Sequence, residues 1–378
     1  MQTSPSSSSA APPTAEDERY QVDRLQGVSR TFALTIPQLP AELARVVRNA
    51  YLLCRIADTI EDDPGLSLEQ QRRFSDMFID VVAGGADAAR FADELHPLLS
   101  PHMLEDERDL ILNTPRVVRI THSCNAAQQA AMLRCVRIMA NGMAWYQERE
   151  TLEGLPDQPA MDRYCYYVAG VVGEMLTELF CDYSEEIARH RDRLMQLAVS
   201  FGQGLQMTNI LKDIWEDRRR GACWLPRDAF LRAGVDLAHL TPDDIPAGFR
   251  TALGELIGVA RQHLENALAY TLLIPPQEKG IRRFCLWAIG MAVLTLKRLN
   301  GRRDFRSGRE VKISRNSVKL TILTTNLTTS SDRLLKSLFA FAAKELPRSD
   351  IHETLSMPGC SSGSQANGCP DGPRIIRQ

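Results

Sequence analysis

Long stretches of helical periodicity are the feature that most restricts the folds open to this chain. In residues 41–60 the apolar side chains recur at spacings of three and four, which gathers them on one face of a helix. The same spacing predicts further helices over residues 133–150, 164–183, 191–217, 249–273 and 281–299. Segments of strand-like composition, such as residues 311–316 and 318–326, are too few to build a sheet. The sequence therefore predicts an all-α fold.

The domain organisation follows from composition along the chain. By length alone, 378 residues suggest two or three domains. No internal repeat and no linker-like composition interrupts residues 19–350, so we expect a single domain there. Residues 1–18 are rich in Ser, Ala and Pro without apolar periodicity, and residues 351–378 have the same character. Both segments are expected to be disordered tails.

Charge and cysteine usage exclude several classes of function. The chain has 45 Lys and Arg against 47 Asp and Glu, and this net charge of −2 argues against bulk attraction to nucleic acid or to an anionic membrane as the main function, although it says nothing about local clusters. Its nine cysteines include no CxxC pair, and the first residues lack the features of a secretory signal, which indicates reduced thiols. The most apolar stretch, residues 284–296, is shorter than the roughly 20 residues that span a bilayer. We expect a cytoplasmic protein without a transmembrane helix.

An acidic cluster stands at the end of the first predicted helix. Asp58, Glu61 and Asp62 have the spacing i, i+3, i+4, so on a helix they share one face. Their like charges repel one another unless a cation lies between them. A single cluster of this kind is usually a solvated helix face, so its meaning depends on the rest of the chain.

The same spacing recurs in Asp213, Glu216 and Asp217, again at the end of an apolar helix. Two identical acidic clusters favour metal binding over a solvated surface. Mg²⁺ prefers oxygen ligands and commonly bridges one or two carboxylates to substrate phosphates. The two clusters therefore predict a magnesium site for a diphosphate.

Arginines near both clusters suit the same chemistry. Arg55 lies one turn before Asp58, Arg30 lies in the segment Ser-Arg-Thr-Phe, and Arg218 follows the second cluster. The planar guanidinium group can bind two phosphate oxygens at once.

Four segments together resemble the squalene/phytoene synthase family, the head-to-head prenyl diphosphate synthases. They are SRTF (29–32), YLLCRIADTIEDD (51–63), YCYYVAGVVGE (164–174) and GLQMTNILKDIWEDRRRG (204–221). The resemblance runs from about residue 28 to residue 329 and is greatest to a bacterial squalene synthase. It implies a single-domain isoprenoid synthase helical bundle around a central apolar cavity, and Mg²⁺-dependent ionisation of an allylic diphosphate.

The resemblance also implies roles for individual residues. The metal ligands are Asp58, Glu61, Asp62, Asp213, Glu216 and Asp217. The catalytic residues are Tyr164, Arg30 and Arg55, and the substrate-binding residues are Ser29, Phe32, Tyr51, Gln206, Asn209, Lys212 and Arg218. In the family the tyrosine matched by Tyr164 is assigned to proton removal during cyclopropane closure. From its chemistry alone, a Tyr at the start of an apolar helix is usually a packing residue, and a phenol is a poor resting base.

Residues 305–313 and the pair Phe284-Cys285 resemble the squalene synthases, which reduce their intermediate with NADPH. The residues expected to bind this cofactor are Arg30, Arg55, Lys212, Lys312 and Arg315. Two positions depart from the eukaryotic pattern, because Lys212 and Ser314 stand where Arg is typical. Residues 221–228 are closer to the phytoene-type pattern, and we expect no C-terminal membrane anchor of the kind that the eukaryotic enzymes carry.

We therefore expect a squalene synthase that condenses two farnesyl diphosphates through presqualene diphosphate and reduces the product with NADPH, in sterol or hopanoid biosynthesis. One alternative is a dehydrosqualene, phytoene-type or hydroxysqualene synthase that uses no NADPH. Another is a non-catalytic helical scaffold, which is expected to have lost one acidic cluster. An apolar product argues for transient contact with the inner face of a membrane, with residues 284–296 as the candidate surface.

Overall fold

The computed structural model describes residues 12–29 and 31–349. Within these residues the chain is helical, and the only strand-like pairing is an isolated bridge between Leu155 and Pro226. The predicted all-α fold is confirmed. The structure divides into two compact units, one within Met1–Ala144 and Glu178–Ser184, the other within Trp145–Thr177 and Glu185–Gln378.

The first unit is built around one long helix, α3 (Ala41–Asp62), which packs against α1, α4, α6 and α7. The helices of this unit besides α3 are α1 (Ala15–Val28), α2 (Phe32–Thr35), α4 (Leu68–Val82), α5 (Ala88–Leu95), α6 (Glu105–Leu112), α7 (Thr114–Ser123) and most of α8 (Ala126–Gln147). The apolar face predicted from the spacing in α3 is the buried one: Leu43, Val47 and Leu53 are all at most 3% exposed.

Helix α1 begins within the segment whose composition suggested an N-terminal tail. It starts at Ala15, after Thr14, which forms a capping box with Asp17. Asp17 is fully buried and accepts two hydrogen bonds from the Arg119 guanidinium, at 2.7 and 3.0 Å. Because a buried carboxylate needs such a partner, this ion pair fixes the first turn of the helix. The partner is a hundred residues away, so composition could not reveal it.

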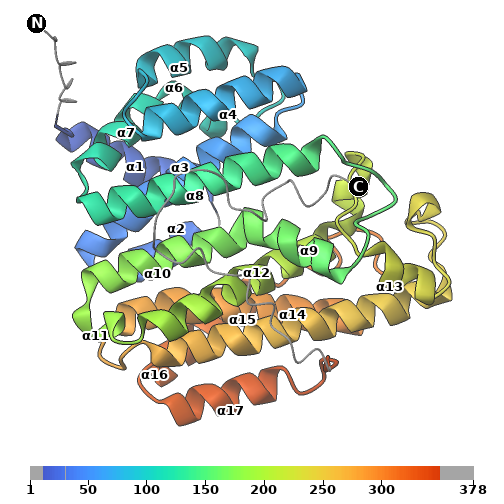
Figure 1. Cartoon of the computed structure of the whole chain (residues 1–378). Coiled ribbons are helices and arrows are strands. Elements are labelled where there is room, and N and C mark those ends of the chain that lie inside the picture. Colours follow the sequence, from blue (N-terminus) through green and yellow to red (C-terminus); the bar gives the residue numbers. More distant parts are fainter. Residues whose placement is uncertain (1–11, 30, 350–378) are drawn as a thin grey trace, which may run out of the picture. The chain divides into compact units, whose positions relative to one another are not determined.

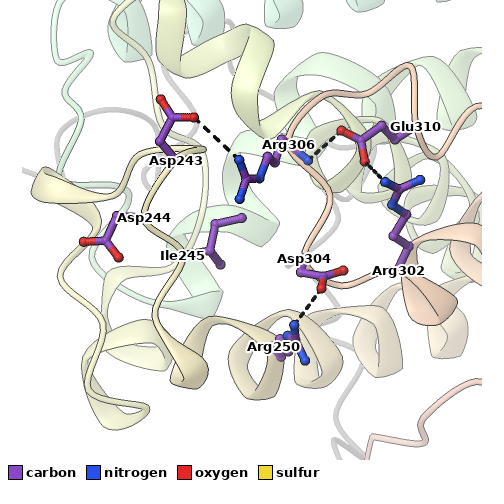
Figure 2. A pocket seen from close by; sticks show the side chains of 8 residues that line it. All are labelled: Asp243, Asp244, Ile245, Arg250, Arg302, Asp304, Arg306 and Glu310. Atoms are coloured by element: carbon purple, nitrogen blue, oxygen red, sulfur yellow. Dashed lines mark hydrogen bonds and ion pairs between the residues drawn. The ribbon is translucent and has the colours of Figure 1, made fainter.

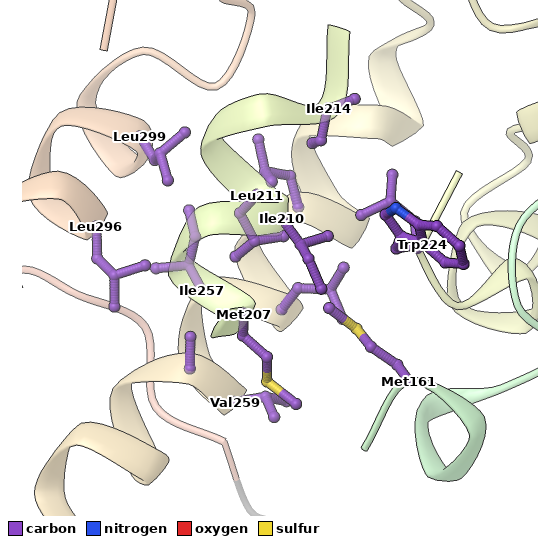
Figure 3. Packing of buried hydrophobic residues seen from close by; sticks show 14 of the residues in the cluster. Met161, Met207, Ile210, Leu211, Ile214, Trp224, Ile257, Val259, Leu296 and Leu299 are labelled. Carbon is purple, nitrogen blue, oxygen red and sulfur yellow. The ribbon is translucent and has the colours of Figure 1, made fainter. Parts of the chain in front are cut away.

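The second unit contains three long helices that pack against one another: α12 (Arg191–Arg219), α14 (Ala247–Leu273) and α15 (Lys279–Gly301) (Figure 1). The others are α9 (Gln158–Cys165), the first half of α10 (Val171–Tyr183), α11 (Glu185–Ala188), α13 (Arg227–Arg232), α16 (Arg315–Thr328) and α17 (Asp332–Ala342). Figure 3 shows their core, in which Met207 and Ile210 of α12 lie among side chains of α9, α14 and α15.

Most helix boundaries follow the periodicity. The helix expected over residues 133–150 instead runs from Ala126 to Gln147, and the one expected from residue 164 begins with α9 at Gln158. Two further departures are local. A π-helical turn, Tyr166–Gly170, interrupts the helix expected over residues 164–183. Helix α12 bends at Asp213, whose backbone angles (φ −101°, ψ 15°) are not helical. Both departures fall beside candidate site residues, where π-turns and bends are common.

The apolar stretch 284–296 lies inside α15 and is buried. Phe284, Ile289 and Leu296 are at most 5% exposed. This stretch is therefore part of the core of the second unit, and the expectation that it forms a membrane-contacting surface is wrong. No helix in the described part of the chain is both long and apolar enough to cross a membrane.

Candidate active site

The first acidic cluster occupies the last turn of α3, which ends at Asp62. Asp58 is 28% exposed, Glu61 is half-buried and Asp62 is exposed. The carbonyl end of a helix carries partial negative charge, so three carboxylates there are disfavoured without a cation. The neighbouring Asp63 has a different task, because its carboxylate accepts hydrogen bonds from the backbone amides of Gly65 and Ser100.

Arg55 lies one turn before Asp58 and is held from two sides. Its Nη1 atom lies 3.8 Å from Asp58 Oδ2, and its Nη2 atom contacts the carboxylate of Glu107 on α6. Its Nε atom is buried without a hydrogen-bond partner among the described residues. An unsatisfied buried donor on a cation fits an anionic ligand such as a phosphate oxygen.

Burial raises the pKa of Asp58 to about 7, although Arg55 opposes the shift. The negative charges of Asp62 and Glu107 add to the rise. Glu107 was missed in the sequence, where it belongs to an acidic run typical of a solvated surface. Only the packing of α6 against α3 places it beside the cluster.

Three of the residues that we predicted to bind substrate lie close together, near the start of α2 and in α3. Ser29 Oγ accepts a hydrogen bond from the Phe32 amide at 3.0 Å, and the rings of Phe32 and Tyr51 lie 5.1 Å apart. The Tyr51 hydroxyl donates to the carbonyl of Val28 at 3.0 Å. Arg30, predicted as catalytic and cofactor-binding, lies outside the described residues.

The second acidic cluster lies at the bend of α12. Since Asp213 is not helical, the three carboxylates do not follow the straight-helix geometry that the spacing implied. Lys212 Nζ lies 3.0 Å from Asp213 Oδ2, and burial raises the pKa of Asp213. Asp217 is largely buried and pairs with Arg220 at 2.6 Å. Glu216 pairs with Arg219 at 3.0 Å.

A loop from later in the chain lies against this cluster. The Gly308 amide donates to both carboxylate oxygens of Glu216, at 3.2 and 3.3 Å. The loop is anchored by the indole of Trp215, which donates to the carbonyl of the buried Phe305 at 2.7 Å. A Cβ atom at Gly308 would lie only 3.0 Å from the Lys212 carbonyl oxygen, so glycine permits this close approach.

The other predicted residues of α12 differ in their surroundings. Gln206 is half-buried and Asn209 is exposed. Arg218 donates to the backbone carbonyls of Leu240 and Leu152, at 3.0 and 3.2 Å. These bonds give its guanidinium a structural role in the second unit, and a substrate contact by Arg218 stays a prediction.

Tyr164 belongs to an aromatic group within the hydrophobic core of the second unit. Its ring stacks on Trp224 with centroids 4.2 Å apart and planes 8° apart, and Tyr146 meets it edge-on at 5.1 Å. Tyr164 is 7% exposed, and burial raises the pKa of Tyr146 to about 12. Trp224 was not predicted as a site residue, since nothing in the sequence links it to a tyrosine sixty positions away.

Basic residues near the end of α15 differ in their pairing. Arg250 of α14 lines a pocket of about 500 Å³ together with Arg302 and Arg306, and each of the three pairs with an acidic residue that also lines the pocket (Figure 2). Lys312 and Arg315, in contrast, are exposed and form no ion pair among the described residues. Unpaired cations fit cofactor phosphates better than neutralised ones.

The described residues contain no preformed group of three His, Cys, Asp or Glu side chains that could hold a metal ion by themselves. Mg²⁺ usually takes only one or two carboxylates and completes its coordination with water and substrate phosphates. Each cluster offers a metal ion only carboxylate oxygens, which fits that mode of binding.

Comparisons with known proteins agree with this chemistry. The family model for squalene/phytoene synthase matches residues 25–317. Squalene synthase of Eremothecium gossypii is 30% identical over 285 residues, which are 73% of this chain and 60% of that protein. Squalene synthase ERG9 of Saccharomyces cerevisiae is 29% identical over 78% of this chain and 64% of its own length. The chain thus spans about 60% of the length of the curated relatives it matches.

Solved structures show the same fold. A complex of TcSQS with the ligand BPH1237 has a TM-score of 0.67 and 25% identity, over 88% of this chain and 98% of that chain. A dehydrosqualene synthase with a bound ligand, 21% identical, has a TM-score of 0.57 over 86% of this chain and 97% of that chain, and is alike in fold alone. Because the family model covers most of the chain, this protein belongs to the squalene/phytoene synthase family.

Proposed function

We propose that this protein is a squalene synthase, a prenyltransferase that joins two farnesyl diphosphates and reduces the product to squalene. The observation that carries the proposal is the pair of intact acidic clusters, each at the end of a long helix, in a chain of this family. Both clusters being intact argues against the alternative of a non-catalytic scaffold. We further propose that residues 19–350 act as one catalytic domain.

In the first step, one donor loses diphosphate and its allylic cation alkylates the double bond of the second donor. Loss of a proton then closes the cyclopropane ring of presqualene diphosphate. Bound Mg²⁺ supplies positive charge to the departing diphosphate. The residues that would hold it are Asp58, Glu61, Asp62, Asp213, Glu216 and Asp217. Arg55 binds diphosphate oxygens through its unsatisfied Nε, while Glu107 fixes the orientation of its guanidinium.

The aromatic group of Tyr146, Tyr164 and Trp224 lies against the hydrocarbon. Its π faces stabilise a passing cation, and its dry surroundings exclude the water that would capture it. We propose that the Tyr164 hydroxyl relays the proton lost during cyclopropane closure: its oxygen takes up that proton as its own hydroxyl proton passes to the departing diphosphate.

NADPH supplies the hydride of the reductive step when it is bound. We propose that Lys312 and Arg315 hold its phosphates, together with Lys212, Arg30 and Arg55. The support for Lys312 and Arg315 is their exposure and their lack of an acidic partner among the described residues. We also propose a cytoplasmic location, peripheral to the inner face of a membrane.

Product analysis by mass tests the proposal. The protein is incubated with farnesyl diphosphate and Mg²⁺, with and without NADPH. Squalene formed only with NADPH is the expected result. Dehydrosqualene or hydroxysqualene under both conditions would show the non-reductive alternative, and no release of diphosphate would contradict the enzymatic proposal.

A further inference from the structure

Helix α16 turns its most apolar side chains outward. Leu320, Leu323 and Leu327 have spacings of three and four, so they share one face, and they are 63%, 58% and 78% exposed. The large exposed hydrophobic residues of α12–α14 and of the first unit occur singly, with no second one three or four positions away in the sequence. Single exposed leucines are ordinary, whereas a row of them marks an interaction surface.

The opposite face of α16 is lined by threonines, and it is this face that packs inward. Thr325 is 5% exposed, and a Cβ atom on Gly290 of α15 would overlap the methyl group of Thr321. Each threonine hydroxyl is satisfied within its own helix, with Thr321 donating to Ser317 and Thr325 donating to Thr321. A helix on a water-facing surface normally has the reverse arrangement, with leucines inside. The outward leucine row thus has a cost in water that a partner would remove.

Helix α17 repeats the pattern. Leu334 and Phe341, seven positions apart, are 52% and 77% exposed, while Leu335 is buried with Leu268 of α14 and Leu286 of α15. Both helices belong to the second unit and pack against each other. We call the exposed apolar side chains of the two helices the leucine face; they are Leu320, Leu323, Leu327, Leu334 and Phe341.

The charges around the leucine face are mostly positive. Residues 312–349 contain seven Lys or Arg and only two Asp or Glu, although the whole chain has a net charge of −2. Helix α16 itself has no acidic residue, and Lys319 lies beside the leucine row. One of the two acids, Asp332, is held by the buried Arg282 at 2.8 Å. Exposed leucines flanked by basic residues are typical of helices that lie in the surface of an anionic bilayer.

We propose that the leucine face docks on an anionic lipid surface. A second copy of the chain is a poorer occupant, because two such basic faces would repel each other. The segment after residue 349 is rich in Gly, Ser and Pro and has no apolar helical spacing with which to cover the row. Docking would also let the apolar polyene product pass directly into the lipid; this point rests on the proposed function.

Vesicle binding tests the proposal on the full chain. Phosphatidylcholine vesicles with and without phosphatidylglycerol are mixed with the wild type, with L320Q/L323Q/L327Q, and with L104Q/L112Q/L231Q. The control variant changes three exposed leucines elsewhere, which are 62%, 46% and 50% exposed. Wild type and control are expected to bind the anionic vesicles, and the α16 variant to bind them about tenfold or more weakly. K319Q/K336Q is expected to lose the dependence on phosphatidylglycerol and on salt.

Three results would overturn the proposal: no binding by the wild type, equal binding by the α16 variant, or a wild-type dimer that the α16 variant dissociates. Melting temperatures show whether each variant remains folded. Release of diphosphate in detergent is measured in parallel. Wild type that binds vesicles but releases no diphosphate would contradict the proposed enzyme and leave the lipid surface intact.

Discussion

The carboxylate of Asp58 is partly buried, is repelled by the charges of Asp62 and Glu107, and lies near the C-terminal end of α3. Asp58→Asn removes a negative charge that we assign to Mg²⁺ binding while keeping the size of the side chain. Turnover is expected to fall about a hundredfold or more, with an unchanged circular dichroism spectrum. Asp76→Asn, at an exposed position of α4, is the control and should keep wild-type turnover. Wild-type turnover in Asp58→Asn would refute the assignment of this cluster to the metal.

His263 of α14 makes the stability of the second unit depend on pH. Its Nδ1 atom lies 2.8 Å from Ser200 Oγ, and burial lowers its pKa to about 4. Above pH 6.5 the imidazole is neutral in both the folded and unfolded states. Between about pH 6.5 and pH 4 the unfolded chain binds a proton that the folded protein does not, so the free energy of unfolding falls as the pH falls, by at most about 3 kcal/mol.

Urea unfolding at pH 7 and pH 5 measures this effect. His263→Gln cannot bind the proton, so its stability should fall less between the two values than that of the wild type. Equal losses in the two proteins would show that His263 is not the group responsible.

At the scale of elements, the loop around Gly308 connects the end of α15 to the second acidic cluster. Gly308→Ala would bring a Cβ atom to 3.0 Å from the Lys212 carbonyl oxygen and 3.3 Å from Asp213 Oδ1, so the loop must shift. Since Glu216 loses its backbone donor, the Mg²⁺ concentration for half-maximal activity should rise about tenfold. Gly301→Ala, where a Cβ atom meets nothing within 4 Å, should leave it unchanged. The same Mg²⁺ dependence in both variants would exclude a role for the loop.

Individual elements also show how far the sequence could be interpreted. The periodicity of α3 and α14 predicted both their extent and their buried faces, because the apolar side chains alone decide which face of a helix is buried. The bend at Asp213 could not be predicted, since it depends on the packing of α12 against its neighbours. For α16 the strand-like composition was misleading, and the helix forms with its threonines toward α15.

At the scale of the whole molecule, the cores of both units are built from apolar side chains, so they pack without a metal. Chelation by EDTA should therefore lower the melting temperature only slightly while abolishing turnover. Mg²⁺ added together with inorganic diphosphate should raise the melting temperature of the wild type by a few degrees, since ligands bind only the folded state. Asp213→Asn should lose most of this rise. A large drop in melting temperature with EDTA alone would instead indicate a structural metal.

The sequence by itself determined the helical class, the positions of the long helices, the two acidic clusters and the family, because these depend on local spacing and on contiguous motifs. Only the tertiary structure decided which charges meet. It pairs Arg55 with Glu107 and stacks Tyr164 on Trp224. It also makes the Gly308 amide donate to Glu216, and Arg218 donate to backbone carbonyls. It also buried residues 284–296 and left the leucines of α16 outside. Such contacts join residues far apart in the chain, and packing between helices, which no local pattern encodes, selects them.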